Sequence, residues 1–290
     1  MPGSLRPDGS TELMMADPNP FSDVRQPAVA GRFYPGAGAT LGLDVDRFLG
    51  SDRGAVPTRM IMVPHAGYVY SGSIAGETYA RTAPRRRAIV LCPNHTGLGS
   101  ARSVSSAAAW QLPGGEMRTD VALRDLVAEH ASLDVEPLAH LREHAVEVQL
   151  PFLRALSPGS TFVAICLARM PLAGCERVAK GIVDAIRAAS AEDDVLLVAS
   201  TDMSHYVTAD VATREDAYAL DCVRHLDAEA LFRVVESRRI SMCGYIPTTV
   251  ALFAAAALGA RNTELVRYGN SGETSGDHDS VVGYAGALVI

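Results

Sequence analysis

The sequence of 290 residues contains a single lysine, Lys180, so arginine carries almost all of its positive charge. Lys180 is not flanked by the glycines and the serine or threonine of a phosphate-binding loop, which excludes a nucleotide site of that type. The 26 basic side chains are outnumbered by 33 acidic ones, and the formal net charge is −7. Because contact with phosphate requires positive patches, a mildly acidic chain is a poor binder of nucleic acid or of anionic membranes.

Long apolar runs and paired cysteines are also absent. The longest strongly apolar stretch, residues 250–258, has nine residues, whereas a membrane span needs about 20. The first residues lack the apolar core of a secretory signal. The five cysteines include no C-x-x-C pair, and the closest two lie nine positions apart. An odd number of cysteines without a signal peptide predicts a protein of the reducing cytoplasm, not associated with a membrane.

The pattern of the remaining sequence predicts an α/β protein. Residues 1–24 are rich in Pro, Gly, Ser and Asp and are predicted to form a disordered tail, followed by one domain over residues 25–290. Apolar runs predict buried strands at residues 60–63, 88–91, 161–167, 195–199 and 285–290. Helical patterns occupy residues 74–81, 121–130, 143–156, 176–189, 214–225, 228–237 and 248–258. This alternation is typical of a single-domain, largely parallel sheet with helices on both faces.

Polar residues follow three of these predicted strands. His65 follows the first strand, His95 the second, and Asp202 and His205 the fourth. Ligands bind beyond the carboxyl ends of the strands in open α/β sheets, so side chains distant in the sequence can converge there. His65 and His95 could hold one metal ion, since imidazole is the commonest protein metal ligand. The alternative is a pair of ordinary loop histidines bonded to backbone groups.

Two further groups have both a chemical and a structural interpretation. Asp202 and His205 are three residues apart, so the carboxylate could orient the imidazole for general acid or base catalysis. Asp202 could equally be a helix N-cap. Cys243 lies in a predicted loop before a helix, where a thiol can be a metal ligand or a redox-sensitive group. The other cysteines fall in strand or helix patterns and are expected to be buried.

A short stretch in the middle of the chain matches a catalytic motif. His140, Glu143 and His144 fit H-x-x-E-H, the inverted zinc-peptidase pattern, in which two histidines bind zinc and the glutamate is the base. A pattern this short also arises by chance, and a helix start with mixed charges explains it as well. His144 and Glu147 are predicted to share one face of a helix. The absence of a G-x-S-x-G elbow counts against an α/β-hydrolase.

Seven ordered motifs resemble those of the Memo family, and the resemblance extends over residues 25–290. They are RQPAVAGRFYP at 25–35, PHAGYVYSG at 64–72, PNHTG at 93–97, EHAVEVQLPF at 143–152, STDMSHY at 200–206, CGYIPT at 243–248 and SVVGYAGALVI at 280–290. Bacterial and archaeal members are called AmmeMemoRadiSam system protein B, and this chain resembles one of them. The resemblance implies a fold similar to the LigB-like class III extradiol ring-cleaving dioxygenases, which hold non-haem Fe(II) with two His and one Glu.

The resemblance also implies a set of functional residues. Family members carry two His and a Cys around the corresponding cleft and are described as binding iron or copper. The implied metal ligands are His65, His95 and Cys243. Asp202 and His205 match an acid and base pair beside the metal, and His144 is implied to line the same cleft and contact substrate. Fe(II) is the expected metal, with Cu or Zn as alternatives. Because Cys243 replaces the glutamate of the dioxygenases, ring cleavage is not inferred from the fold.

Three functional hypotheses follow. The first is a metal-dependent oxidoreductase, on an unknown small-molecule or peptide substrate. The second is a non-catalytic accessory protein that binds a peptide or another ligand, with the AMMECR-like and radical SAM proteins implied by the system name as partners; eukaryotic relatives are described as adaptors that bind phosphotyrosine peptides. The third is a zinc hydrolase built on His140, Glu143 and His144, and it alone requires His140.

Overall fold

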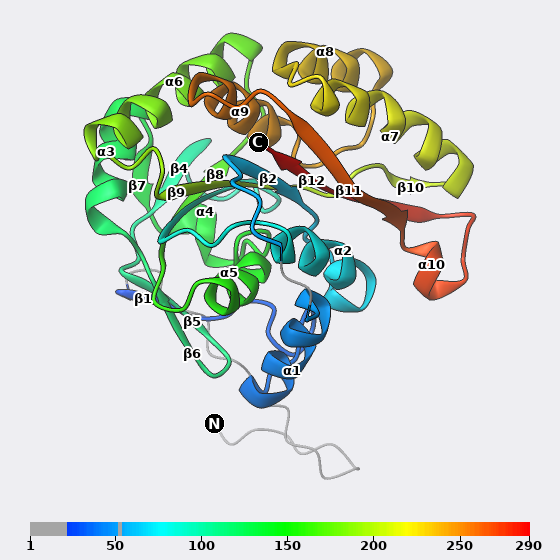
Figure 1. Ribbon diagram of the computed structural model, residues 1–290, viewed down its shortest axis with the longest axis horizontal. Coiled ribbons are helices and arrows are strands. Elements are labelled where there is room, and N and C mark those ends of the chain that lie inside the picture. Colours follow the sequence, from blue (N-terminus) through cyan, green and yellow to red (C-terminus); the bar gives the residue numbers. More distant parts are fainter. Residues whose placement is uncertain (1–21, 52–53) are drawn as a thin grey trace, which may run out of the picture.

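In the computed structural model, which describes residues 22–51 and 54–290, a nine-stranded sheet separates two groups of helices (Figure 1). Four parallel strands form its centre, in the spatial order β2 (Met60–Val63), β9 (Val195–Ser200), β3 (Arg87–Pro93) and β8 (Thr161–Leu167). Antiparallel pairing begins on either side of this centre, where β12 (Val281–Val289) joins β2 and β4 (Arg102–Ser105) joins β8. The largely parallel sheet predicted from the sequence is therefore confirmed at its centre, and it is mixed at both margins.

The remaining strands extend these margins or form a second sheet. Strands β10 (His205–Val207) and β11 (Thr263–Asn270) pair with β12, and β7 (Asp134–Glu136) pairs with β4. A separate three-stranded sheet contains β1 (Val24–Arg25), β5 (Ala109–Leu112) and β6 (Gly115–Arg118).

Helices cover both faces of the large sheet (Figure 1). One face carries α3 (Val121–Ala131), α6 (Leu172–Ala188), α7 (Ala209–Arg224), α8 (Ala228–Arg238) and α9 (Tyr245–Ala257). The other face carries the small sheet together with α1 (Gly38–Leu49), α2 (Tyr68–Ala80) and α5 (Leu150–Leu156). Three short elements lie in the connections, namely α4 (Leu138–Leu141), the 3₁₀ turn η1 (Glu147–Gln149) and α10 (Gly272–Ser275).

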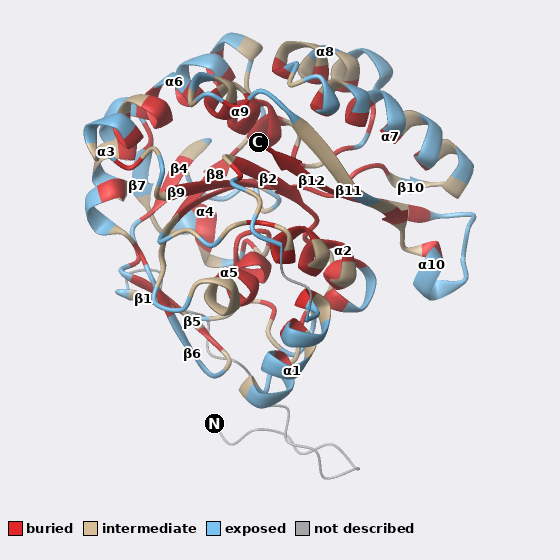
Figure 2. Ribbon diagram, in the orientation of Figure 1, coloured by how far each residue is buried: buried red, intermediate tan, exposed pale blue. Residues whose placement is uncertain are grey.

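The central strands are buried on both sides (Figure 2). Along β2, Met60 and Met62 pack into the core beneath α6 and α9, whereas Ile61 and Val63 pack into the core on the opposite face. Successive side chains of a strand point to opposite faces, so a strand with helices above and below must be apolar at every position. This is why the five predicted strands were recognisable as continuous apolar runs, and all five are present.

The largest error in the predicted helices concerns residues 143–156. Only Leu150–Leu156 is α-helical, preceded by η1. The carboxylate of Glu143 accepts hydrogen bonds from the backbone N–H groups of His144 and Ala145, at 2.9 and 3.0 Å. A side chain that binds the backbone in this way competes with helical hydrogen bonds, so the segment remains irregular. His144 and Glu147 therefore do not share a helix face.

The structure describes only the end of the predicted tail. Residues 1–21 lie outside the described residues. Residues 22–24 were wrongly included in the tail, because Val24 belongs to β1 and the carbonyl oxygen of Asp23 accepts a hydrogen bond from the N–H of Ala108 at 2.7 Å. Across the described part of the chain, every helix is too short or too polar to cross a membrane.

Candidate metal centre

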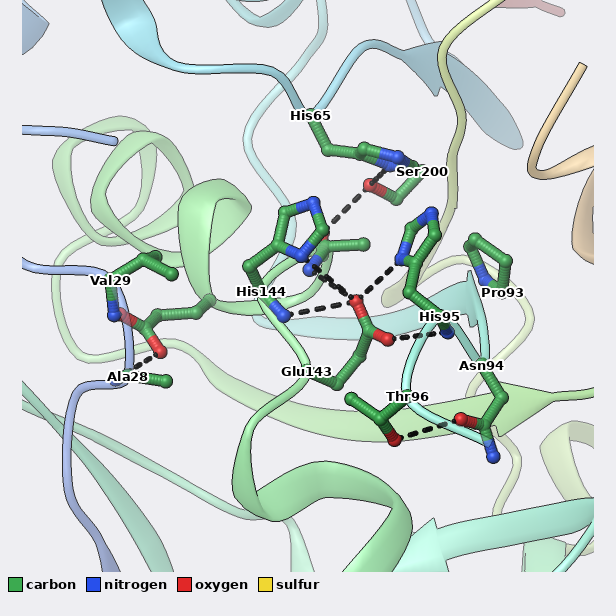
Figure 3. Close-up of polar contacts among 12 residues, drawn as sticks. Ala28, Val29, His65, Pro93, Asn94, His95, Thr96, Glu143, His144 and Ser200 are labelled. Atoms are coloured by element: carbon green, nitrogen blue, oxygen red, sulfur yellow. Dashed lines mark hydrogen bonds and ion pairs between the residues drawn. The ribbon is translucent and has the colours of Figure 1, made fainter. Parts of the chain in front are cut away.

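Adjacent parallel strands bring the predicted site residues to one edge of the sheet. Because β9 lies between β2 and β3, the segments that follow these strands meet at their carboxyl ends. His65 follows β2, His95 follows β3, and Ser200 is the last residue of β9. Figure 3 shows the imidazoles of His65 and His95, together with that of His144, close to one another.

Cys243 comes to the same place from the turn that precedes α9. The next residue, Gly244, packs so tightly that a Cβ atom on it would lie 2.4 Å from Cβ of Thr201 and 2.7 Å from the carbonyl oxygen of Ser200. Glycine therefore allows the loop to approach the end of β9, and its N–H donates to Oγ1 of Thr201 at 3.0 Å. This approach leaves Sγ of Cys243 3.2 Å from Nε2 of His65.

His65 is buried and held by two side chains. Its backbone N–H donates to Oδ1 of Asp202 at 2.7 Å, and its Nδ1 lies 3.0 Å from Oγ of Ser200. Burial, together with the neighbouring imidazole of His95, lowers the pKa of His65 to about 3. His65 is therefore neutral at physiological pH, which is the form of imidazole that binds metals.

His95 is paired with the buried carboxylate of Glu143. Its Nδ1 lies 2.9 Å from Oε1, and its backbone N–H donates to Oε2 at 2.8 Å. Burial acts to lower the pKa of His95, but the hydrogen bond and charge of Glu143 outweigh burial and raise it. Burial acts to raise the pKa of Glu143, but the hydrogen bond from His95 and several further donors lower it to about 2. The ionised Glu143 therefore holds a proton on Nδ1 of His95 and leaves Nε2 as the atom that could bind a metal.

Ligand atoms of His65, His95 and Cys243 all lie within 4.8 Å of one another. Two imidazole nitrogens and a sulfur form a donor set that suits Fe(II), Cu or Zn, so these residues fit a metal of that class. Burial, and then the charge of Asp202, raises the pKa of the Cys243 thiol. The thiol is therefore protonated until a cation displaces its proton. The fold thus brings together the three ligands implied by the resemblance.

A second group of side chains shares His95. Ligand atoms of His95, Glu143 and His144 also lie within 4.8 Å of one another. The Glu143 carboxylate, however, already accepts hydrogen bonds from the ring of His95 and from three backbone N–H groups. This group is therefore explained as a hydrogen-bond network that orients His95.

The predicted pairing of Asp202 with His205 is not what the fold provides. Asp202 accepts the N–H of His65, and its Oδ2 lies 3.9 Å from Nε2 of the same residue. Burial raises the pKa of Asp202, against the opposite effect of the hydrogen bond from the His65 backbone. Nδ1 of His205 instead lies 2.8 and 2.9 Å from the carbonyl oxygens of Met203 and Ser241. Asp202 therefore positions His65, while two backbone carbonyls orient His205; the catalytic roles of Asp202 and His205 stay predictions.

His144 lines the candidate site beside the proposed ligands. Its ring stacks on that of His95, with centroids 4.8 Å apart, and lies perpendicular to that of His65 at 5.3 Å. Burial, followed by the nearby His65, lowers the pKa of His144 to about 4. Its side chain is 20% exposed, so it can be reached from solvent. Contact with a substrate stays a prediction for this residue.

The H-x-x-E-H motif does not assemble into a zinc site within the described residues. His140 lies in α4, which ends at Leu141, so His140 and His144 do not share a helix. Nε2 of His140 bonds instead to Oγ of Ser103 at 2.9 Å, and its ring packs against Trp110. His140 belongs to neither group of candidate ligands. The zinc-hydrolase hypothesis, which needs this residue, is therefore abandoned.

Arg25 and Glu147 hold the loop that carries Glu143, a role that the sequence alone did not reveal. Arg25 donates to Oε2 of Glu147 at 2.6 Å and to the carbonyl oxygens of His140 and Glu143, each at 2.7 Å. Glu147 also accepts hydrogen bonds from two backbone N–H groups and a tyrosine hydroxyl within residues 28–34. Residues 25–35, the first family motif, therefore hold the loop that carries Glu143 in position. The sequence did not show that the charges of Arg25 and Glu147 are buried and paired with each other, so it gave no sign of this role.

Comparison with known proteins agrees with this arrangement. The family model of Memo-like proteins matches residues 25–288. A MEMO1 family protein of Aquifex aeolicus is 37% identical over 276 residues, covering 92% of this chain and 99% of the relative. A MEMO1 family protein of Methanococcoides burtonii is 38% identical, covering 92% of this chain and all of the relative.

A solved structure is also similar. An uncharacterized protein of Escherichia coli K12 superposes with a TM-score of 0.52 at 15% identity, covering 80% of this chain and 99% of the other. At this identity the similarity concerns the fold alone, and the kinship with ring-cleaving dioxygenases stays a prediction. The matches over nearly the whole sequence show that the chain belongs to the family of Memo-like proteins.

Proposed function

We propose that this protein is a metal-dependent redox protein, an oxidoreductase whose substrate binds at the carboxyl ends of β2, β3 and β9. The observation that carries the proposal is the convergence of His65, His95 and Cys243, whose ligand atoms lie within 4.8 Å of one another. When bound, Fe(II) or Cu would supply redox chemistry at these ligands, and Zn would supply Lewis-acid chemistry. Fe(II) is our first choice of metal.

The surrounding residues have distinct roles in this proposal. Asp202 holds the backbone of His65, and Glu143 orients His95. His205 donates its Nδ1 proton to backbone carbonyls, since a carbonyl oxygen can only accept. Its Nε2 is therefore the basic atom, and we assign it proton exchange with a bound substrate. His144 would contact that substrate.

Metal analysis tests the proposal directly. Protein purified anaerobically should contain near-stoichiometric iron or copper, and a His65→Ala/Cys243→Ser double variant should contain none. A His225→Ala/Cys222→Ser double variant is the matched control, because it removes one histidine and one cysteine from α7 and the turn that follows it, away from the candidate ligands. Wild-type protein that holds no metal even after anaerobic reconstitution would refute the proposal.

A second candidate function is an accessory protein that acts with AMMECR-like and radical SAM partners. Exposed apolar side chains in the same segments as the site residues favour it: Val69 and Tyr70 lie shortly after His65, Leu98 shortly after His95, and Tyr206, which is 80% exposed, directly follows His205. Such side chains are suited to contact another protein or a peptide. Co-purification with those partners, combined with no turnover by the isolated chain, would favour this candidate over the first.

A further inference from the structure

We propose that Ser200, held in place by Gln149, fixes the tautomer of His65 so that Nε2 is its free ligand atom. Ser200 ends β9 and Gln149 lies in η1, and both are fully buried. Neither residue is among the candidate ligands, so their role is one of positioning. The consequence for metal affinity rests on the proposed function, whereas the tautomer itself can be tested without a metal.

The orientation of the Gln149 amide is the first step of the argument. Its Nε2 lies 2.8 Å from the carbonyl oxygen of Pro64 and 2.9 Å from Oγ of Ser200. Its Oε1 accepts a hydrogen bond from the hydroxyl of Tyr79 at 3.2 Å. Because a carbonyl oxygen can only accept, the NH₂ group must face Pro64, and its second proton is directed at Ser200.

The single proton of the Ser200 hydroxyl is the second step. Its Oγ lies 2.7 Å from the carbonyl oxygen of Ala145, which again can only accept, so the hydroxyl donates there. One lone pair of Oγ accepts from Gln149, and the other faces Nδ1 of His65 at 3.0 Å. If Nδ1 were unprotonated, two acceptors would face each other inside a buried site, which is unfavourable. Nδ1 of His65 therefore carries the proton.

The result is an imidazole whose Nε2 is free to bind a metal. A neutral histidine has one N–H, so Nε2 of His65 keeps its lone pair, and this atom lies 3.2 Å from Sγ of Cys243. Glu143 orients His95 in a comparable way, but through a negative charge. Ser200 is a neutral acceptor and fixes the proton of His65 without adding a charge to the buried site.

Nitrogen NMR of the metal-free, full-length protein tests the tautomer. Long-range ¹H–¹⁵N correlations of labelled histidines, with His65 assigned from a His65→Gln variant, should show a protonated Nδ1 and an unprotonated Nε2. A Ser200→Ala variant should show a substantial Nε2–H population, because Nδ1 loses its acceptor. Ser103→Ala, which removes a second buried bond between a serine and a histidine ring, should alter His140 and leave His65 unchanged. An Nε2–H tautomer in the wild type would overturn the proposal, whatever the variants do.

Titration with Co(II) alone separates this inference from the proposed function. Loss of an outer hydrogen bond to a ligand histidine typically weakens metal affinity by about 10–100-fold, and we expect Ser200→Ala to do so while Ser103→Ala does not. Equal affinity of wild type and Ser200→Ala would show that Ser200 does not position the ligand. The predicted tautomer in a protein that binds no metal would instead uphold the tautomer assignment and refute the metal function.

Discussion

At the scale of single residues, the site depends on which atoms carry protons. Burial lowers the pKa of His65 to about 3 and that of His144 to about 4, so both rings are neutral near pH 7. Glu143 raises the pKa of His95 against the effect of burial, and the thiol of Cys243 is kept protonated by burial. The cluster can therefore lose protons when a cation arrives, chiefly from Cys243.

We predict that metal affinity rises with pH because of this thiol. Displacing one proton from Cys243 should increase the apparent affinity about tenfold per pH unit above neutrality. His65 adds nothing to this slope, since it is already deprotonated, while His95 should steepen it at lower pH. Co(II) titrations between about pH 7 and 9 would measure the slope. The Cys243→Ser variant should lose it, and a wild-type affinity independent of pH would contradict the assignment of the thiol as a ligand.

At the scale of elements, close approach between helices decides how the sheet is covered. Gly181 of α6 faces α3 so closely that a Cβ atom would lie 2.3 Å from Cα of Ala131 and 2.4 Å from the carbonyl oxygen of His130. Backbone atoms cannot move aside as a flexible side chain does. Gly42 of α1, by contrast, has nothing within 4 Å of its Cβ position. The same substitution should therefore have opposite effects at these two helical positions.

We predict that Gly181→Ala destabilises the protein by about 1–3 kcal/mol or more, through overpacking between α3 and α6. Gly42→Ala should stabilise it by about 0.5–1 kcal/mol, because alanine favours an open helical position. Denaturant unfolding of both variants measures the two changes in the free energy of unfolding. A Gly181→Ala variant as stable as the wild type would show that α3 and α6 are not in this close contact, and a destabilised Gly42→Ala variant would contradict the open position of Gly42.

At the scale of the whole molecule, buried histidines should make the native state sensitive to acid. His140 lies outside the candidate centre, and burial lowers its pKa to about 4. In the unfolded chain its pKa is near 6.5. As the pH falls from 6.5 to 4, His140 therefore becomes protonated in the unfolded chain but stays neutral in the native state, which favours unfolding. The part of the stability that depends on neutral His140 is therefore fully present above about pH 6.5 and is lost progressively towards pH 4.

We predict that His140→Gln reduces this acid sensitivity. Between pH 6.5 and 4, the variant should lose roughly 3 kcal/mol less of its free energy of unfolding than the wild type. His225→Gln, at an exposed position, serves as the control and should follow the wild-type curve. Parallel pH profiles for wild type and His140→Gln, measured by denaturant unfolding, would mean that His140 does not stay neutral in the native state.

The sequence by itself determined the central strands of the large sheet and the location of most candidate site residues. The apolar runs of β2, β3, β8 and β9 are continuous because both faces of each strand are buried, and this pattern is local. His65 and His95 were recognisable for the same reason, since each follows directly on such a run. Cys243 was recognisable as a loop cysteine that could bind a metal or be oxidised, but only the family motif placed it with His65 and His95.

Only the tertiary structure decided which groups meet. Glu143 orients His95 from 48 residues away, and Asp202 contacts His65, 137 residues away, although His205 is nearer in the sequence. The spatial order β2, β9, β3 places the ends of these strands side by side, and no local pattern encodes that order. Hydrogen-bond partners and burial set the protonation of the imidazoles and of the thiol. The sequence therefore supplied the candidate ligand atoms, whereas their protonation and their approach to one another depend on long-range packing.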